Sequence, residues 1–139
     1  MSVIVEIQKQ LVAPKGQWNG HMNFAYRSAE DIVDAVKPLL HAQGLHLILS
    51  DEMVNLGDRY YVKATATVWD GDKFVSEATG YAREQQIKKG MDEAQITGAA
   101  SSYARKYALN GLFAIDDGKD ADSQDNTQQG QPKDAPRNQ

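Results

Sequence analysis

The stretch that decides the fold is LHLILSDEMVNLGDRYYVKATATVWDGDKFVSEATGYARE, residues 45–84. Apolar and polar side chains alternate along it, and this period of two predicts β-strands. Gly57 interrupts the alternation once, and the pair Asp70–Gly71, a strong hairpin signal, interrupts it again. We therefore expect a three-stranded antiparallel meander.

The middle strand of this meander should present two different faces. Alternate residues from Tyr60 to Val68 point to one side, and those from Tyr61 to Trp69 point to the other. The third strand carries a face of mostly small side chains, which would let a helix pack closely. These residues are Phe74, Ser76, Ala78, Gly80 and Ala82.

Helices are expected before and after the meander in the chain, which makes the fold class α+β. Residues 3–12 space their apolar side chains as a short amphipathic helix does. Ser28 is a good N-cap for a second helix over residues 29–42. Pro38 lies inside that run, so we expect a kink or an early end near Lys37.

The segment GAASSYARKYALNGLF, residues 98–113, predicts a third helix with two unlike sides. The apolar side contains Tyr103 and Tyr107, which we assign to the core. Two cations and several small residues share the other side, where an extended polyanion could approach and receive hydrogen bonds at its phosphates. Tight packing or a solvated face explains the same pattern, and the helical wheel does not decide between these explanations. This second side comprises Gln95, Gly98, Ser101, Ser102, Arg105 and Lys106.

Composition divides the 139 residues into a folded domain over 1–115 and a tail over 116–139. The tail has six acids against three bases, no large apolar residue and many Asp and Gln, so we expect it to be disordered. The remaining 13 acids and 12 bases nearly balance, although the whole chain carries −4. A local basic groove is therefore compatible with the acidic total.

Several classes of chemistry find no support in the sequence. The chain has no cysteine, no phosphate-binding loop of the GxxxxGK[ST] type, and no apolar run of membrane-spanning length. The segment DDGKDAD at residues 116–122 lacks the ligand spacing of a calcium loop, and the three histidines lack metal-ligand spacing. We expect a cytoplasmic protein that is not an enzyme and holds no metal or cofactor.

Three segments together resemble the Erf (essential recombination function) family of phage single-strand annealing proteins. They are FAYRSAEDIVDAVKPLL at residues 24–40, GLHLILSD at 44–51 and QITGAASSYARKYALNGLFAIDDGKDAD at 95–122. The resemblance covers most of residues 15–122 and implies a meander backed by a helix, as in ring-forming annealing proteins.

The resemblance implies a function as well. It implies binding of single-stranded DNA by a homo-oligomer, as a ring or a helical filament, in the cytoplasm of a bacterial host. It also implies ATP-independent annealing of complementary strands in phage homologous recombination, with a phage exonuclease or a host single-stranded DNA-binding protein as further partners. Passive coating of single strands, or a protein–protein adaptor role, remain alternatives.

Candidate DNA contacts follow from matching the family's motifs. Arg105 and Lys106 are expected to contact phosphates, with Ser101, Ser102 and Gln95 in support. Lys88 and Lys89 would extend the positive track, and Lys63 and Arg83 would line the groove. Each of these four could equally be a solvated charge.

The loop before the second helix adds further candidates. Trp18 and Arg27 would stack on bases there, at about 1–3 kcal/mol per base, or help to hold the loop on the core. We expect the nearby Phe24 to anchor the loop.

Overall fold

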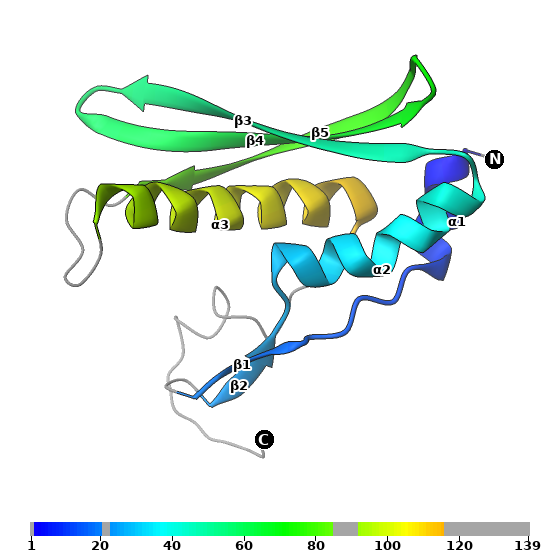
Figure 1. The fold of residues 1–139 in the computed structure, drawn as a ribbon, viewed down its shortest axis with the longest axis horizontal. Helices are drawn as coiled ribbons and strands as arrows, with labels where there is room; N and C mark the ends of the chain where they lie inside the picture. The colour runs from blue at the N-terminus through cyan, green and yellow to red at the C-terminus, as the bar shows by residue number, and fades with distance from the viewer. Residues whose placement is uncertain (1, 21–22, 85–91, 116–139) are drawn as a thin grey trace.

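The computed structural model describes residues 2–20, 23–84 and 92–115 and confirms an α+β fold. Within these residues, three helices accompany a two-stranded and a three-stranded antiparallel sheet (Figure 1). The elements in chain order are α1 (Val3–Gln10), β1 (Gln17–Asn19), β2 (Phe24–Tyr26), α2 (Ala29–Ala42), β3 (His46–Leu56), β4 (Arg59–Asp70), β5 (Lys73–Arg83) and α3 (Glu93–Phe113). Among these described residues, no helix is both long and apolar enough to cross a membrane.

The predicted meander is confirmed, with strand order β3-β4-β5. Gly57 and Gly71 make the two turns, and both adopt positive φ values (65° and 60°) that favour glycine. Figure 1 shows the sheet as one layer, with α3 running along one face and α1 and α2 on that same side. The helices therefore form the second layer of the domain.

The buried face of β4 is the one that the alternation predicts. Val62, Ala64, Ala66 and Val68 are at most 1% exposed and form the centre of the core. Tyr60 belongs to the same set but lies at the start of the strand, where it is 52% exposed.

Close packing of α3 on the sheet depends on Gly80. It pairs with Ala64 in the register, and a methyl group at Gly80 would lie 2.5 Å from the carbonyl oxygen of Ala104 and the amide nitrogen of Ala108. The backbone of α3 therefore almost touches β5, as the small residues of that strand predict. Phe74 does not share this face, because a register shift pairs it with Trp69, and it is 55% exposed.

This close approach also decides which side of α3 is buried. Only small side chains fit against the sheet in the middle of the helix, and larger ones enter the core near its C-terminal end. Tyr103 lies outside the core and is 46% exposed, so its assignment to the core is wrong. Tyr107 is half-buried. The buried apolar residues of α3 are Ala100, Ala104, Ala108, Leu109, Leu112 and Phe113.

The start of α2 is fixed by a reciprocal cap. The Ser28 hydroxyl accepts from the Asp31 amide at 3.1 Å, and the Asp31 carboxylate accepts from the Ser28 amide at 2.9 Å. At the other end, the expected early stop near Lys37 is wrong, because the helix continues through Pro38 to Ala42. The fully buried Leu40 in the last turn holds this part of the helix against the core.

A short hairpin, β1–β2, occupies the segment that we expected to be an irregular loop. Its register pairs Gln17 with Tyr26 and Trp18 with Ala25. Figure 1 shows it on the opposite side of the helical layer from the meander. The Arg27 side chain, just after β2, donates through Nε to the carbonyl of Ala13 at 2.9 Å and fixes the base of the hairpin. The disorder expected for 116–139 concerns residues outside those that the structure describes.

Candidate nucleic-acid interface

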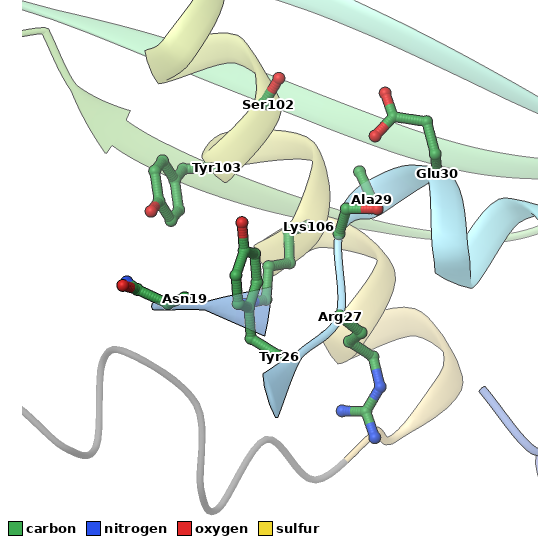
Figure 2. Close-up of a pocket in the computed structure, with 9 residues that line it drawn as sticks. Asn19, Tyr26, Arg27, Ala29, Glu30, Ser102, Tyr103 and Lys106 are labelled. Atoms are coloured by element: carbon green, nitrogen blue, oxygen red, sulfur yellow. The ribbon is translucent and has the colours of Figure 1, made fainter. Parts of the chain in front are cut away.

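A pocket of about 240 Å³ opens where the β1–β2 hairpin, the start of α2 and the middle of α3 meet (Figure 2). We call it the hairpin–α3 pocket. It joins residues from three separate segments of the chain, and three of its lining residues were predicted to contact DNA: Arg27, Ser102 and Lys106. The lining residues are Asn19, Tyr26, Arg27, Ser28, Ala29, Glu30, Ser102, Tyr103 and Lys106.

Lys106 forms the floor of the pocket and is not an open surface cation. Its ammonium lies 5.9 Å from the centre of the Tyr26 ring, a cation–π distance, and the residue is only 4% exposed. The expectation of an exposed phosphate-binding Lys106 is therefore wrong in its geometry. The hairpin that covers it was absent from the sequence prediction, which is why the helical wheel placed Lys106 in solvent.

Aromatic surface remains accessible at the mouth of the pocket. Tyr103 is 46% exposed, and its ring centre lies 6.2 Å from that of Tyr107, one helical turn further on. Tyr26 from β2 and Tyr103 from α3 line the same opening beside Asn19, as Figure 2 shows. Ser102, the residue before Tyr103 in α3, is also exposed. Two rings and two polar side chains thus face one opening.

Arg105 points to the other side of α3, towards β3. Its Nε donates to Asp51 Oδ1 at 3.0 Å and its Nη2 donates to Oδ2 at 3.2 Å, while the Ser101 hydroxyl donates to the same carboxylate. Successive residues of a helix are turned by about 100°, so Arg105 and Lys106 diverge. The continuous cationic face expected on α3 is therefore divided into two separate sites.

The Asp51 cluster has a consequence for stability against pH. Partial burial raises the pKa of Asp51, but hydrogen bonds from Arg105 and Ser101 and the charge of Arg105 outweigh this effect, so the pKa lies below its ordinary 3.8. A carboxyl with a lowered pKa in the folded state stabilises the protein above its ordinary pKa and loses that contribution as pH falls through the folded value.

Asp51→Asn should lower the free energy of unfolding at pH 7 by up to about 1 kcal/mol, because the pair is partly solvated. The difference from the unsubstituted protein should shrink below pH 3.8, as pH falls through the lowered pKa of Asp51 in the folded protein. Urea unfolding across pH measures this. Glu52→Gln is the matched control, since Glu52 is 69% exposed and 3.9 Å from Lys63. A difference for Asp51→Asn that stays constant into strong acid would contradict the assignment.

The other side chains that were predicted to contact DNA do not point into one common site. Gln95 caps α3, accepting from the Asp92 amide at 3.0 Å and donating its own amide to Asp92 Oδ1 at 2.9 Å. Trp18 is 61% exposed, but the hairpin register puts it on the opposite face from Tyr26. Figure 2 shows the Arg27 guanidinium directed away from the two tyrosines, so only its stem lines the pocket.

Of the four other cations that were predicted to contact DNA, two lie on the sheet and two fall outside the described residues. Lys63 and Arg83 lie on the face of the meander away from the helices. Lys88 and Lys89 fall outside the described residues, as does the segment 116–122 that superficially resembles a calcium loop. Within residues 2–20, 23–84 and 92–115, no group of three or more acidic or histidine side chains is placed to hold a metal.

The sequence analysis assigned Tyr103 to the core and so missed it as a surface residue. The available signal was the small face of β5. Gly80 and Ala78 let α3 approach β5 so closely that a large side chain does not fit between them. The Tyr103 ring therefore lies beside the sheet and not beneath it.

Fold and pocket together define an α+β domain whose helical side gathers a lysine and two tyrosines at one opening. The model of the ERF superfamily matches residues 2–139, and the chain belongs to that family. It is 60% identical over 126 residues to the "Essential recombination function protein" of Salmonella phage P22. This alignment covers 91% of the chain but 60% of the relative's length. No solved structure matches the chain.

Proposed function

We propose that this protein binds single-stranded DNA and promotes ATP-independent annealing of complementary strands during phage recombination. Membership of the ERF superfamily and the name of the P22 relative support the recombination role. Because the chain spans 60% of that relative, the DNA-binding step is assigned here to residues 1–115 on their own features. The observation that carries the assignment is the hairpin–α3 pocket, with Tyr26 and Tyr103 at its mouth.

The pocket suits an unpaired base better than a phosphate. Tyr103 offers an exposed ring on which a base can stack, and base–aromatic stacking tolerates any sequence. Asn19 and Ser102 supply hydrogen-bonding groups, whereas Glu30 adds a carboxylate that disfavours an anion inside the pocket. Lys106 contributes a positive potential from beneath Tyr26. The phosphates of a bound strand would accordingly lie outside the pocket.

Preference for single strands follows from this mode of binding. A base inside a duplex has both faces covered by its neighbours and cannot stack on Tyr103 without leaving the helix. A homo-oligomer, as a ring or a filament, would join many such modest sites along one strand and raise the overall affinity. Annealing needs no nucleotide hydrolysis in this scheme, because the energy comes from base pairing between the strands.

The decisive experiment follows the pairing of two complementary oligonucleotides, one of them fluorescently labelled, with and without the protein and without ATP. Pairing should accelerate when protein is present. The logarithm of the affinity for a thymidine oligonucleotide should also fall linearly with the logarithm of salt concentration, because phosphate contacts release counterions. Slower pairing would assign the protein to passive coating, and affinity independent of salt would favour an adaptor role.

A further inference from the structure

The face of the meander that points away from the helices is uncovered among the described residues. Val62 and Ala64 of β4 face the helical layer, so Lys63 between them and Tyr61 just before them face away. Figure 1 shows α1, α2 and α3 all on one side of the sheet. This outer face is therefore a surface separate from the hairpin–α3 pocket, which lies in the helical layer.

Aromatic and cationic side chains alternate at one end of this outer face. The register places Tyr61 directly opposite Arg83, and Lys63 directly opposite Tyr81. Arg59 precedes Tyr61 by two residues and belongs to the same face. We call these five residues the outer-face patch. Tyr81 is 51% exposed, and the Lys63 side chain is 31% exposed.

The outer-face patch is positively charged, whereas the whole chain is negatively charged. The patch holds three cations; Glu52 on β3 reaches it, with its carboxylate 3.9 Å from the Lys63 ammonium, and Asp58 precedes Arg59 in the chain. The chain as a whole carries −4. Such a local excess on an acidic protein favours a polyanion as the occupant. The exposed ring of Tyr81, beside the half-buried Tyr61, adds a stacking surface for unpaired bases. Cations together with aromatic rings are the combination by which proteins hold single strands.

We propose that the outer-face patch is a second contact surface for single-stranded DNA and holds the strand that is to be paired. The inference rests on the annealing function proposed above. A strand in the hairpin–α3 pocket is separated from the patch by α3 and the sheet, so one subunit presents two surfaces for two strands. Cross-strand threonines, Thr65 and Thr79, continue the same face and supply hydroxyl donors beside the patch.

The test uses the full chain and a variant that carries Tyr81→Ala and Arg83→Ala. The matched control carries Lys73→Ala and Phe74→Ala, which removes one cation and one exposed aromatic ring from the other end of the same strand; Phe74 is 55% exposed. All four side chains are exposed, and Phe74 also contacts the Trp69 ring edge to face at 6.0 Å between ring centres. Thermal unfolding checks that both variants fold. Sedimentation compares their oligomeric state.

Two quantities are measured: affinity for a first thymidine oligonucleotide, and capture of a labelled adenosine oligonucleotide by the preformed complex. The patch variant should keep first-strand affinity within about twofold and lose about tenfold or more in second-strand capture, as removal of a stacked base and a phosphate contact predicts. The control should change neither quantity.

Unchanged capture, or equal loss of both quantities, would overturn the proposal. A change of oligomeric state in the patch variant alone would also overturn it, because the face would then belong to a contact between subunits. Failure of the unsubstituted protein to bind the first oligonucleotide would instead reject the proposed function itself, so the two failures are distinguishable.

Discussion

Gly80→Ala should lower the free energy of unfolding by about 2–3 kcal/mol, the largest stability effect expected for a single methyl group in this protein. The added carbon would meet the Ala104 carbonyl oxygen and the Ala108 amide nitrogen at 2.5 Å. Both atoms belong to the backbone of α3, so neither can rotate away and the helix must shift from the sheet. Urea unfolding followed by circular dichroism measures the change.

Gly98→Ala provides the matched control. Gly98 lies in the same helix that Gly80 contacts, but a methyl group there meets nothing within 4 Å. Alanine has a higher helix propensity than glycine, so this substitution should stabilise the protein by up to about 1 kcal/mol. If Gly80→Ala were as stable as the unsubstituted protein, α3 could not lie as close to β5 as the structure places it.

Tyr103→Ala should weaken binding of a thymidine oligonucleotide by about 5- to 140-fold. The range corresponds to the loss of one stacking interaction of about 1–3 kcal/mol, at 1.4 kcal/mol for each tenfold change. Tyr103→Phe keeps the ring and should bind within about twofold of the unsubstituted protein. Fluorescence anisotropy of a labelled oligonucleotide measures both affinities.

Tyr60→Ala controls for the loss of any exposed aromatic ring. Tyr60 is 52% exposed, comparable to Tyr103, and lies at the start of β4, outside the pocket lining. It should not alter affinity. Lys106→Ala is a poorer probe, because Lys106 is 4% exposed and its removal would disturb packing as well as charge. Equal losses for Tyr60→Ala and Tyr103→Ala would remove the pocket from the binding surface.

The meander could be predicted because its signals are local. Alternation along β4 fixes which side chains are buried, and Asp70–Gly71 marks a turn regardless of the rest of the chain. The small face of β5 also predicted close helix packing correctly, as Gly80 demonstrates. Each of these features depends on residues within a few positions of one another.

The faces of α3 could not be predicted in the same way, because they depend on elements distant in sequence. The helical wheel groups Arg105 with Lys106, but Asp51 from β3 holds the first and Tyr26 from β2 covers the second. Neither partner has a signal within α3 itself. The short hairpin was missed for a related reason, since three-residue strands are too brief to display a period.

Pro38 illustrates how tertiary packing overrides a local signal. Proline removes one backbone donor and favours an end to the helix. The next turn of α2 nevertheless places Leu40 in the core with no exposed surface. Burial of a leucine is worth about 1.5–3 kcal/mol, which is comparable to the cost of the proline and keeps the helix intact to Ala42.

Photo-crosslinking decides directly whether a single strand passes over the hairpin–α3 pocket. The full chain is irradiated with a limiting amount of an oligonucleotide that carries 5-iododeoxyuridine, and the modified residues are identified by mass spectrometry. Crosslinks should fall on Tyr26 or Tyr103, and Tyr103→Phe should retain them. A strand that binds and crosslinks while both tyrosines stay unmodified would contradict the proposed site.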